Sequence, residues 1–309
     1  MKKVVILLGP TGVGKTGVSM LLAKALNTEI ISADSMQIYR QMDIGTAKPT
    51  VEERAMIIHH MIDVVDPWES FSTGKYISGV APIIENLHKV GKVPVVVGGT
   101  GLYIKAMTRG IFSGPAADWK LRTELLSQAE ENSGALYDYL KGLDPAAAEK
   151  ITRGDTRRII RAIEVCLKSS TSMSEMQKKL TRPLPCEFIK IGLTRDRSEL
   201  YSIIERRVDR MLESGFVEEV RNLLTMNPDK TPMQAIGYKE IASYLKGEIP
   251  LVDAVSLMKR NTKRYAKRQF TWFRKEEGVD WVDLTGIYDA SEAFDVVCRL
   301  ITSLRVTAH

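Results

Sequence analysis

The sequence predicts an α/β fold with a parallel sheet core, an inserted helical domain and a helix-rich C-terminal part. Short apolar runs such as 4–8 and 93–97 end in glycines and polar residues, as buried strands do. Strand signals disappear from 113 to about 150, where helical segments take their place. We therefore expect the first part of the core at 1–112, the helical insertion at 113–150, and the rest of the core with a basic helical part at 151–309.

The first strand leads into a glycine-rich turn and then a helix. The turn reads Gly9-Pro10-Thr11-Gly12-Val13-Gly14-Lys15-Thr16, which fits the pattern G-x-x-x-x-G-K-[ST] in full. Such a loop directs backbone N–H groups and a helix N-terminus at phosphate oxygens. Lys15 would neutralise the far phosphate, and Thr16 would hold Mg²⁺. The core is therefore expected to be P-loop NTPase-like, with a loop that suits a nucleoside triphosphate and a prenyl diphosphate equally.

Charge and composition narrow the class of protein. The chain has 309 residues, with 44 Lys and Arg against 38 Asp and Glu. Residues 1–150 carry 16 of each sign, so the basic excess lies in 151–309 and suggests a polyanionic partner. The three cysteines stand far apart without a C-x-x-C motif, which predicts neither a disulfide framework nor a zinc site. No apolar run approaches membrane-spanning or signal-peptide length, so we expect a cytoplasmic protein outside the membrane.

Polar side chains follow two further strands of the predicted sheet. Asp34 follows the strand at 29–33, and Thr100 follows the strand at 93–97. Because ligands of an open α/β sheet lie beyond the carboxyl ends of its strands, Asp34 should face the same crevice as Lys15. Its carboxylate could ligate a metal or act as a general base. The strand at 93–97 ends in glycines and Thr100 rather than in an acid, which counts against simple ATP hydrolysis.

Capping and periodicity predict the remaining elements in order. We expect helices at 76–87, 118–131, 144–150, 155–164, 200–212 and 217–224, strands at 187–193 and 280–284, and a final helix to 304. Pro82 should kink its helix or mark the first turn. Asp144 followed by Pro145 is typical of a capped helix start. His59 and His60 cannot share a helix face, so we interpret them as structural.

Two groups of basic residues could bind an anionic partner. Arg157, Arg158 and Arg161 should lie on or near one face of the helix at 155–164, where they could grip a nucleotide, a diphosphate or RNA. Residues 259–275 include eight basic residues and no acidic one, with lysines and arginines repeating at i, i+4. This spacing predicts a helix with one apolar stripe and a wide cationic face, for which RNA or DNA is the preferred partner.

Six segments of the chain form a set. They are residues 9–16, Ser32-Ala33-Asp34-Ser35-Met36-Gln37-Ile38-Tyr39, Asp43-Ile44-Gly45-Thr46-Ala47-Lys48-Pro49, Gly98-Gly99-Thr100-Gly101-Leu102-Tyr103, Gln234-Ala235-Ile236-Gly237-Tyr238-Lys239-Glu240 and Ala266-Lys267-Arg268-Gln269-Phe270-Thr271-Trp272-Phe273. Together they resemble the IPP transferase family, the bacterial tRNA dimethylallyltransferases. The resemblance spans nearly the whole chain, and the segments after the phosphate loop are more specific than the loop itself.

The resemblance implies transfer of a dimethylallyl group from dimethylallyl diphosphate to N6 of the adenosine 3′ of the anticodon in tRNA. Asp34 would act as the base, while the loop, Lys15, Mg²⁺ on Thr16 and one arginine would stabilise the leaving diphosphate. Thr100 would support the reacting pair. The implied tRNA-binding residues are Asp34, Ser35, Met36, Gln37, Thr100, Arg157, Arg158, Arg161, Gln234 and Lys239. We add Arg122 for its position in the insertion, and Lys263, Arg264, Lys267 and Arg268 because the basic helix would contact the phosphate backbone. We expect the chain to act as a monomer.

Two alternatives stay open at the level of the sequence. A P-loop small-molecule kinase would use the loop for ATP and the arginines as a lid, without any tRNA. A nucleotide-gated RNA-binding protein without catalysis would need the basic helix but not Asp34. Neither alternative explains the whole set of segments, although ATP could still bind the loop.

Overall fold

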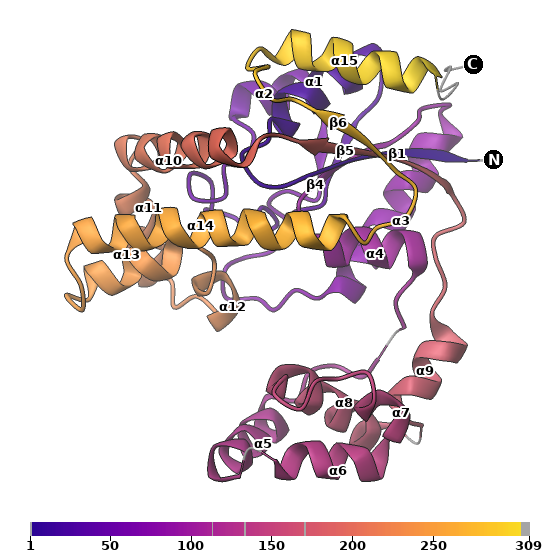
Figure 1. Ribbon diagram of the computed structural model, residues 1–309, viewed down its shortest axis with the longest axis vertical. Coiled ribbons are helices and arrows are strands. Elements are labelled where there is room, and N and C mark those ends of the chain that lie inside the picture. Colours follow the sequence, from indigo (N-terminus) through magenta and orange to yellow (C-terminus); the bar gives the residue numbers. More distant parts are fainter. Residues whose placement is uncertain (1, 113, 133, 170, 304–309) are drawn as a thin grey trace. The chain divides into compact units, whose positions relative to one another are not determined.

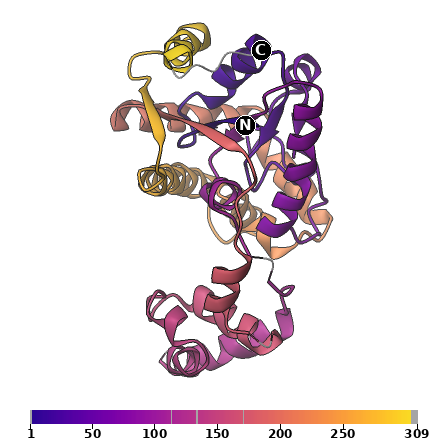
Figure 2. The same ribbon diagram turned by 90° about the vertical axis from the view of Figure 1, so that its right-hand side faces the viewer.

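The computed structural model describes residues 2–112, 114–132, 134–169 and 171–303 (Figures 1 and 2). It divides into one compact unit of Met1–Lys105 with Pro185–His309 and a second unit of Ala106–Leu184. The first unit holds the sheet and the second is helical, which confirms the predicted α/β fold with a helical insertion. Among the described residues, no helix has the length and apolar character that crossing a membrane requires.

The first unit is built on a parallel sheet of six strands in the order β3-β2-β4-β1-β5-β6. The strands are β1 (Lys3–Leu8), β2 (Ile30–Ser32), β3 (His59–His60), β4 (Val95–Gly98), β5 (Glu187–Thr194) and β6 (Val279–Asp283). Leu8 at the end of β1 pairs with Gly98 and Gly192 on the two sides. The segments that follow β1, β2 and β4 therefore leave the sheet at the same edge. His59 and His60 form a strand that was too short to predict.

Helices cover the sheet and extend from it. They are α1 (Lys15–Ala25), α2 (Val51–Met56), α3 (Thr73–Lys89), α4 (Gly101–Arg109), α10 (Arg197–Glu213), α11 (Phe216–Thr225), α12 (Lys230–Met233), α13 (Tyr238–Leu245), α14 (Leu251–Phe273) and α15 (Ala290–Ser303). Val5 and Leu7 of β1 pack against α1 and α15, which lie side by side in both views. Pro82 lies inside α3 rather than in its first turn, because Ser72 caps the helix one residue before Thr73. The predicted end of the last helix, Leu304, lies outside the described residues.

A second core joins α10, α11, α13 and α14 to the segment that follows β2. Phe216, Val220 and Tyr238 are fully buried in it, and Tyr39 packs against them from that segment. The basic helix α14 begins at Leu251, earlier than the basic run alone indicated. Of the predicted apolar row, Ala266 and Phe273 are buried and Phe270 is half-buried. The helix also buries Ala254, Met258 and the polar Gln269.

The helical unit is wider than the expected insertion at 113–150. It comprises α5 (Trp119–Glu131), α6 (Ala135–Leu143), α7 (Pro145–Ala148), α8 (Thr156–Lys168) and α9 (Met173–Leu180). Ile159 and Ile163 of α8 share one core with Leu136 and Leu140 of α6. The insertion therefore runs on past 150, because α8 buries its apolar face against the earlier helices. Ser113, its expected start, lies outside the described residues.

A buried carboxylate ties the helical unit together. Glu164 is fully buried and accepts hydrogen bonds from the amide of Asp118 at 2.6 Å, from Arg122 at 2.8 and 2.9 Å, and from Arg161. Burial favours the neutral acid, but the bonds from Arg122, the Asp118 amide and Arg161 hold the pKa of Glu164 below its ordinary value. Two arginines expected to face an anionic ligand are thus engaged inside their own unit.

We expect Glu164→Ala to destabilise the helical unit by about 3 kcal/mol, because two partly buried guanidinium groups lose their counter-charge. Asp138→Ala removes the partner of Arg153 in an exposed ion pair at 3.3 Å and should cost less than about 1 kcal/mol. Urea unfolding followed by circular dichroism compares the two variants. Equal losses of stability would contradict the assigned role of Glu164.

Candidate active site

The carboxyl ends of β1, β2 and β4 open into a cavity of about 590 Å³ within the first unit. Its walls come from the phosphate loop, the segments after β2, helices α10 and α14, and the chain around α12. The predicted site residues that line it are Thr11, Gly12, Gly14, Lys15, Thr16, Asp34, Ser35, Met36, Gln37, Gln234 and Arg268. The topology thus brings the phosphate loop and the candidate base into one cavity.

The phosphate loop is shaped for an anion by its glycines. A Cβ atom on Gly9 would lie 2.7 Å from the carbonyl oxygen of Leu193, so the close passage of β5 requires glycine there. Gly14 has φ 108° and offers no side chain to cap α1, whose first turn also lacks an acidic residue. No side chain of the described residues caps the first turn of α1, and Lys15, Thr16 and Gly17 of that turn line the cavity, which is the arrangement that binds phosphate.

Lys15 folds over the loop that precedes it. Its Nζ donates hydrogen bonds to the carbonyl oxygens of Gly9 at 2.9 Å and Pro10 at 2.8 Å. Burial and the nearby charge of Arg207 lower the pKa of Lys15 to about 7, and Asp34 opposes the shift. A bound anion should therefore favour the protonated ammonium form of Lys15 over the neutral amine.

Arg207 is a site residue that the sequence analysis missed. It lines the cavity from α10, and its Nη1 donates to the Thr11 hydroxyl of the phosphate loop at 3.2 Å. Burial lowers the pKa of its guanidinium, while Asp34 opposes that effect. A signal was present, because Arg207 follows buried Ile204 by three positions and precedes buried Met211 by four. A charge within the apolar row of a helix indicates a role other than solvation.

Asp34 lines the same cavity as these cations, and one of its carboxylate oxygens is held by backbone amides. Its Oδ1 accepts hydrogen bonds from the amides of Met36 at 2.8 Å and Gln37 at 3.4 Å, while its Oδ2 accepts none from the described residues. Thr100 does not line the cavity. Its Oγ1 accepts from the amide of Ser35 at 3.0 Å, so Thr100 supports the Asp34 turn from behind.

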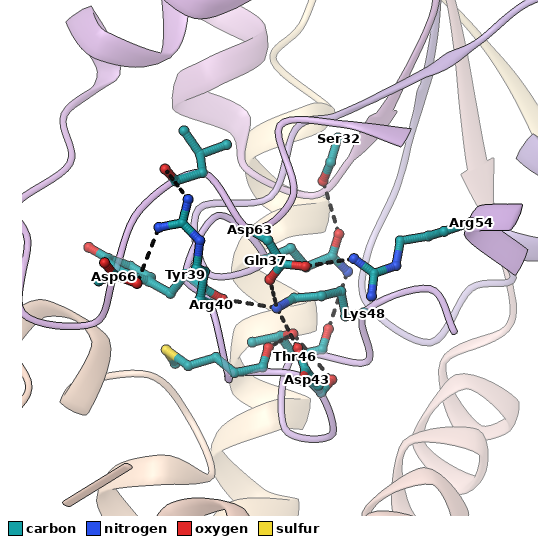
Figure 3. Close-up of polar contacts among 12 residues, drawn as sticks. Ser32, Gln37, Tyr39, Arg40, Asp43, Thr46, Lys48, Arg54, Asp63 and Asp66 are labelled. Atoms are coloured by element: carbon teal, nitrogen blue, oxygen red, sulfur yellow. Dashed lines mark hydrogen bonds and ion pairs between the residues drawn. The ribbon is translucent and has the colours of Figure 1, made fainter. Parts of the chain in front are cut away.

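Gln37 holds the wall of the cavity rather than presenting a free amide. Its Oε1 accepts from the Ser32 hydroxyl at 2.9 Å, and its Nε2 donates to the carbonyl oxygen of Thr46 at 3.3 Å (Figure 3). The same Nε2 donates to the carbonyl oxygen of Ala47 at 3.2 Å. The predicted RNA contact of this side chain would compete with these bonds. Gln37 instead fastens the Asp34 turn to the loop that follows it.

Gln269 is the polar residue in the buried stripe of α14. Only 6% of it is exposed, and its Oε1 accepts from the amide of Thr11 at 2.9 Å while its Nε2 donates to the carbonyl oxygen of Gly99 at 2.9 Å. A Cβ atom on Gly99 would lie 2.2 Å from that nitrogen, which explains the glycine. Gln269 lies between Ala266 and Phe273 in the apolar stripe, and this position could have indicated from the sequence that its side chain is buried.

The cationic face of α14 is narrower than its sequence suggested. Lys263 forms an ion pair with Glu205 of α10, and Lys259 pairs with Asp209 at 2.6 Å. The predicted tRNA-binding residues Arg264 and Lys267 are exposed and have no partner among the described residues, whereas Arg268 lies over the ring of Tyr265 and lines the cavity. The prediction for Lys263 was incomplete, because acids of a neighbouring helix are not visible in the run of bases.

The other predicted cations are not among the residues that line the cavity. Lys239 lies outside it and contacts Glu240 at 3.6 Å. In the helical unit, Arg122 and Arg161 bind Glu164, and Arg158 pairs with Asp155 at 3.3 Å. Arg157 is exposed on α8.

Comparison with known proteins identifies relatives along nearly the whole chain. Residues 37–276 match the family model described as IPP transferase, and residues 2–63 match the model described as isopentenyl transferase. The tRNA dimethylallyltransferase of Thermodesulfovibrio yellowstonii is 56% identical over 98% of this chain and 97% of the relative. That of Acetivibrio thermocellus is 48% identical over 99% of this chain and 97% of the relative.

Solved structures give the same relationship. The tRNA isopentenylpyrophosphate transferase of Bacillus halodurans superposes with a TM-score of 0.73 at 42% identity, over 98% of this chain and 96% of that one. A eukaryotic dimethylallyltransferase acting on tRNA superposes with a TM-score of 0.82 at 29% identity, over 98% of this chain and 80% of that one.

The pKa of Lys15 predicts a proton-linked binding step. Above pH 7 the free lysine loses its proton, and a bound phosphate restores the charge, so diphosphate should bind with proton uptake at pH 8 and with falling affinity as the pH rises. Calorimetry with inorganic diphosphate, in buffers of different ionisation enthalpy, measures the uptake. Lys15→Arg keeps its charge and should take up fewer protons by as much as one. Equal uptake by the two proteins would exclude this coupling.

Proposed function

The chain belongs to the IPP transferase family, and we propose that it transfers a dimethylallyl group from dimethylallyl diphosphate to N6 of the adenosine 3′ of the anticodon in tRNA, releasing diphosphate. One observation carries the proposal at the level of the site: a phosphate loop, two partly buried cations and a carboxylate line the same cavity. A kinase could use the same loop and a carboxylate base, so the choice of an amine acceptor rests on the family shown above.

The phosphate side of the cavity serves the leaving group. As the bond between the dimethylallyl carbon and the diphosphate oxygen breaks, negative charge develops on the diphosphate. The N-terminus of α1, Lys15 and Arg207 line this side of the cavity, where their positive charge can stabilise the developing anion. Arg207 is thus our candidate for the arginine that the resemblance implied.

The carboxylate side serves the acceptor. The lone pair of the adenine amine is delocalised into the ring, so N6 attacks carbon well only if its proton is removed as the new C–N bond forms. The free Oδ2 of Asp34 is the acceptor for that proton. The Met36 amide holds Oδ1, and Thr100 holds the turn through Ser35, so the second oxygen stays directed.

A metal ion fits the phosphate side. No described group of three or more His, Cys, Asp or Glu side chains could hold one, so a cation would need oxygens from the substrate. The exposed hydroxyl of Thr16 lines the cavity, and Mg²⁺ is commonly held by few protein oxygens together with phosphates and waters. When bound, Mg²⁺ would neutralise charge on the diphosphate.

The RNA side is assigned from exposure and charge. An anticodon-loop base can be splayed out of its stack at modest cost and enter a cavity. Arg268 lines the cavity, and exposed Arg264 and Lys267 share its helix, which suits phosphates on either side of the target base. Arg157 and Arg158 stay proposed RNA contacts of the helical unit. We propose that the chain acts as a monomer in the cytoplasm.

Mass spectrometry of tRNA tests the reaction directly. With Mg²⁺ and dimethylallyl diphosphate, unmodified tRNA should gain one C5H8 unit on the adenosine 3′ of the anticodon. Asp34→Asn keeps the Oδ1 acceptor and should bind both substrates while losing roughly 10²-fold to 10⁴-fold in rate. A parallel reaction with ATP and no tRNA covers the kinase alternative. Consumption of ATP with unmodified tRNA would overturn the proposal, and full activity of the variant would remove Asp34 as the base.

The basic helix should act through phosphates. Replacing Arg264 and Lys267 by Gln should weaken the binding of all tRNAs to the same extent. The slope of log affinity against log salt concentration should fall in magnitude by about 1 for each phosphate that the variant no longer neutralises. Lys263→Gln is the matched control, since its charge is already paired with Glu205 and its removal should change the slope less. Filter binding over a range of salt concentrations measures both. An unchanged slope in the double variant would exclude this face.

A further inference from the structure

Two of the motif segments, 43–49 and 234–240, take no direct part in the reaction described above. Both converge on Glu219 of α11, a residue outside every motif. Its Oε2 accepts from the amides of Asp43 at 3.0 Å and Ile44 at 2.7 Å, and its Oε1 accepts from the amide of Gly45 at 3.1 Å. Three successive N–H groups that converge on one carboxylate form a backbone cradle for an anion.

The second segment closes the cradle. The hydroxyl of Tyr238 donates to Oε1 of Glu219 at 2.6 Å, and burial together with this carboxylate raises the pKa of Tyr238 far above its ordinary value. The ring of Tyr238 meets that of Phe216 edge-on at 5.0 Å. A Cβ atom on Gly45 would lie 2.3 Å from Phe216 and 2.5 Å from Tyr238, so only glycine brings the loop amides this close.

The far end of the loop is anchored by a buried lysine. Lys48 donates to the carbonyl oxygen of Tyr39 at 2.9 Å and to the carboxylates of Asp43 at 2.5 Å and Asp63 at 2.6 Å (Figure 3). Arg54 holds Asp63 in turn at 2.6 Å. The loop is therefore fixed at both ends, by Glu219 at its start and by Lys48 at its finish.

The loop so fixed is a wall of the cavity. Gly45, Thr46 and Ala47 line it together with Tyr238, and the carbonyl oxygens of Thr46 and Ala47 hold the amide of Gln37 beside the Asp34 turn. The phosphate side is held separately. There, Arg207 of α10 and Gln269 of α14 form hydrogen bonds with Thr11 of the phosphate loop.

We propose that Glu219 is a positioning residue for the acceptor, an inference that rests on the proposed transferase function. It holds the loop at 43–47 against α11, and through Gln37 that loop holds the Asp34 turn at the distance that N6 requires. Loss of Glu219 therefore weakens reaction with tRNA and leaves diphosphate binding intact. A residue important only for general stability would affect both substrates.

Glu219→Gln tests the proposal, with Glu218→Gln as the matched control. The amide of Gln turns N–H donors toward the loop amides, whereas Glu218 is exposed on the same helix turn and pairs with Arg221. We expect Glu219→Gln to lower kcat/KM for tRNA at least tenfold with the affinity for dimethylallyl diphosphate within twofold. Hydrogen exchange of a peptide covering 42–49 should become faster in Glu219→Gln and stay unchanged in Glu218→Gln.

Tyr238→Phe keeps the test decisive if Glu219→Gln does not fold. It removes one of the donors and should give a smaller loss of kcat/KM for tRNA, again without loss of diphosphate affinity. Wild-type kcat/KM in Glu219→Gln, or equal losses for both substrates, would overturn the proposal. Failure of the wild-type protein to modify tRNA would instead overturn the transferase function, while the hydrogen-exchange comparison would still report whether Glu219 anchors the loop.

Discussion

The two hydrogen bonds of the buried Gln269 amide hold the site together. They connect α14 to the phosphate loop through Thr11 and to the turn after β4 through Gly99. Parallel pairing already brings the ends of β1 and β4 to one edge, but pairing alone leaves the two turns independent. The side-chain amide of Gln269 provides one acceptor and one donor in a fixed geometry. The distance between the two turns therefore depends on the position of α14, the helix that also carries the exposed Arg264 and Lys267.

The cavity concentrates opposite charges that are not paired face to face. The charge of Arg207 lowers the pKa of Lys15, and the charge of Asp34 opposes the lowering of both pKa values. Such an arrangement stabilises the empty protein little, because each group is partly desolvated and incompletely matched. Its value appears when charge moves during a reaction, since the field is already in place. The site is therefore built for charge separation between a leaving anion and a proton acceptor.

The features that could be predicted from the sequence are those that depend on residues close together in the chain. The phosphate loop, the strand ends at Asp34 and Thr100 and the helical insertion are read from neighbouring residues. Helical spacing marked Arg207 and Gln269 as polar residues in an apolar row, but it could not give their roles, because their hydrogen-bond partners lie at least 170 residues away in the chain. Glu219 stood outside every motif, and the loop amides that it binds are equally distant. The same limit explains the overestimated basic faces. The acidic partners of Lys263 and Arg122 lie 58 and 42 residues away, so folding had to bring them together. Glu164 follows Arg161 by three positions on one helix, and that pair could have been expected from the sequence.

The pairing of β1 with β5 also has a consequence for biosynthesis. The ribosome completes residues 3–8 early, but their neighbour at 187–194 follows the whole helical unit, and Gln269 comes later still. In a nascent chain, the phosphate loop therefore lacks its hydrogen bond to Gln269 until α14 has been synthesised. The helical unit has its own core and can fold before β5 pairs with β1. Its folding shortens the flexible chain between these two strands, which lowers the entropic cost of pairing them. Competence to hold a diphosphate is therefore acquired at the end of synthesis rather than during it.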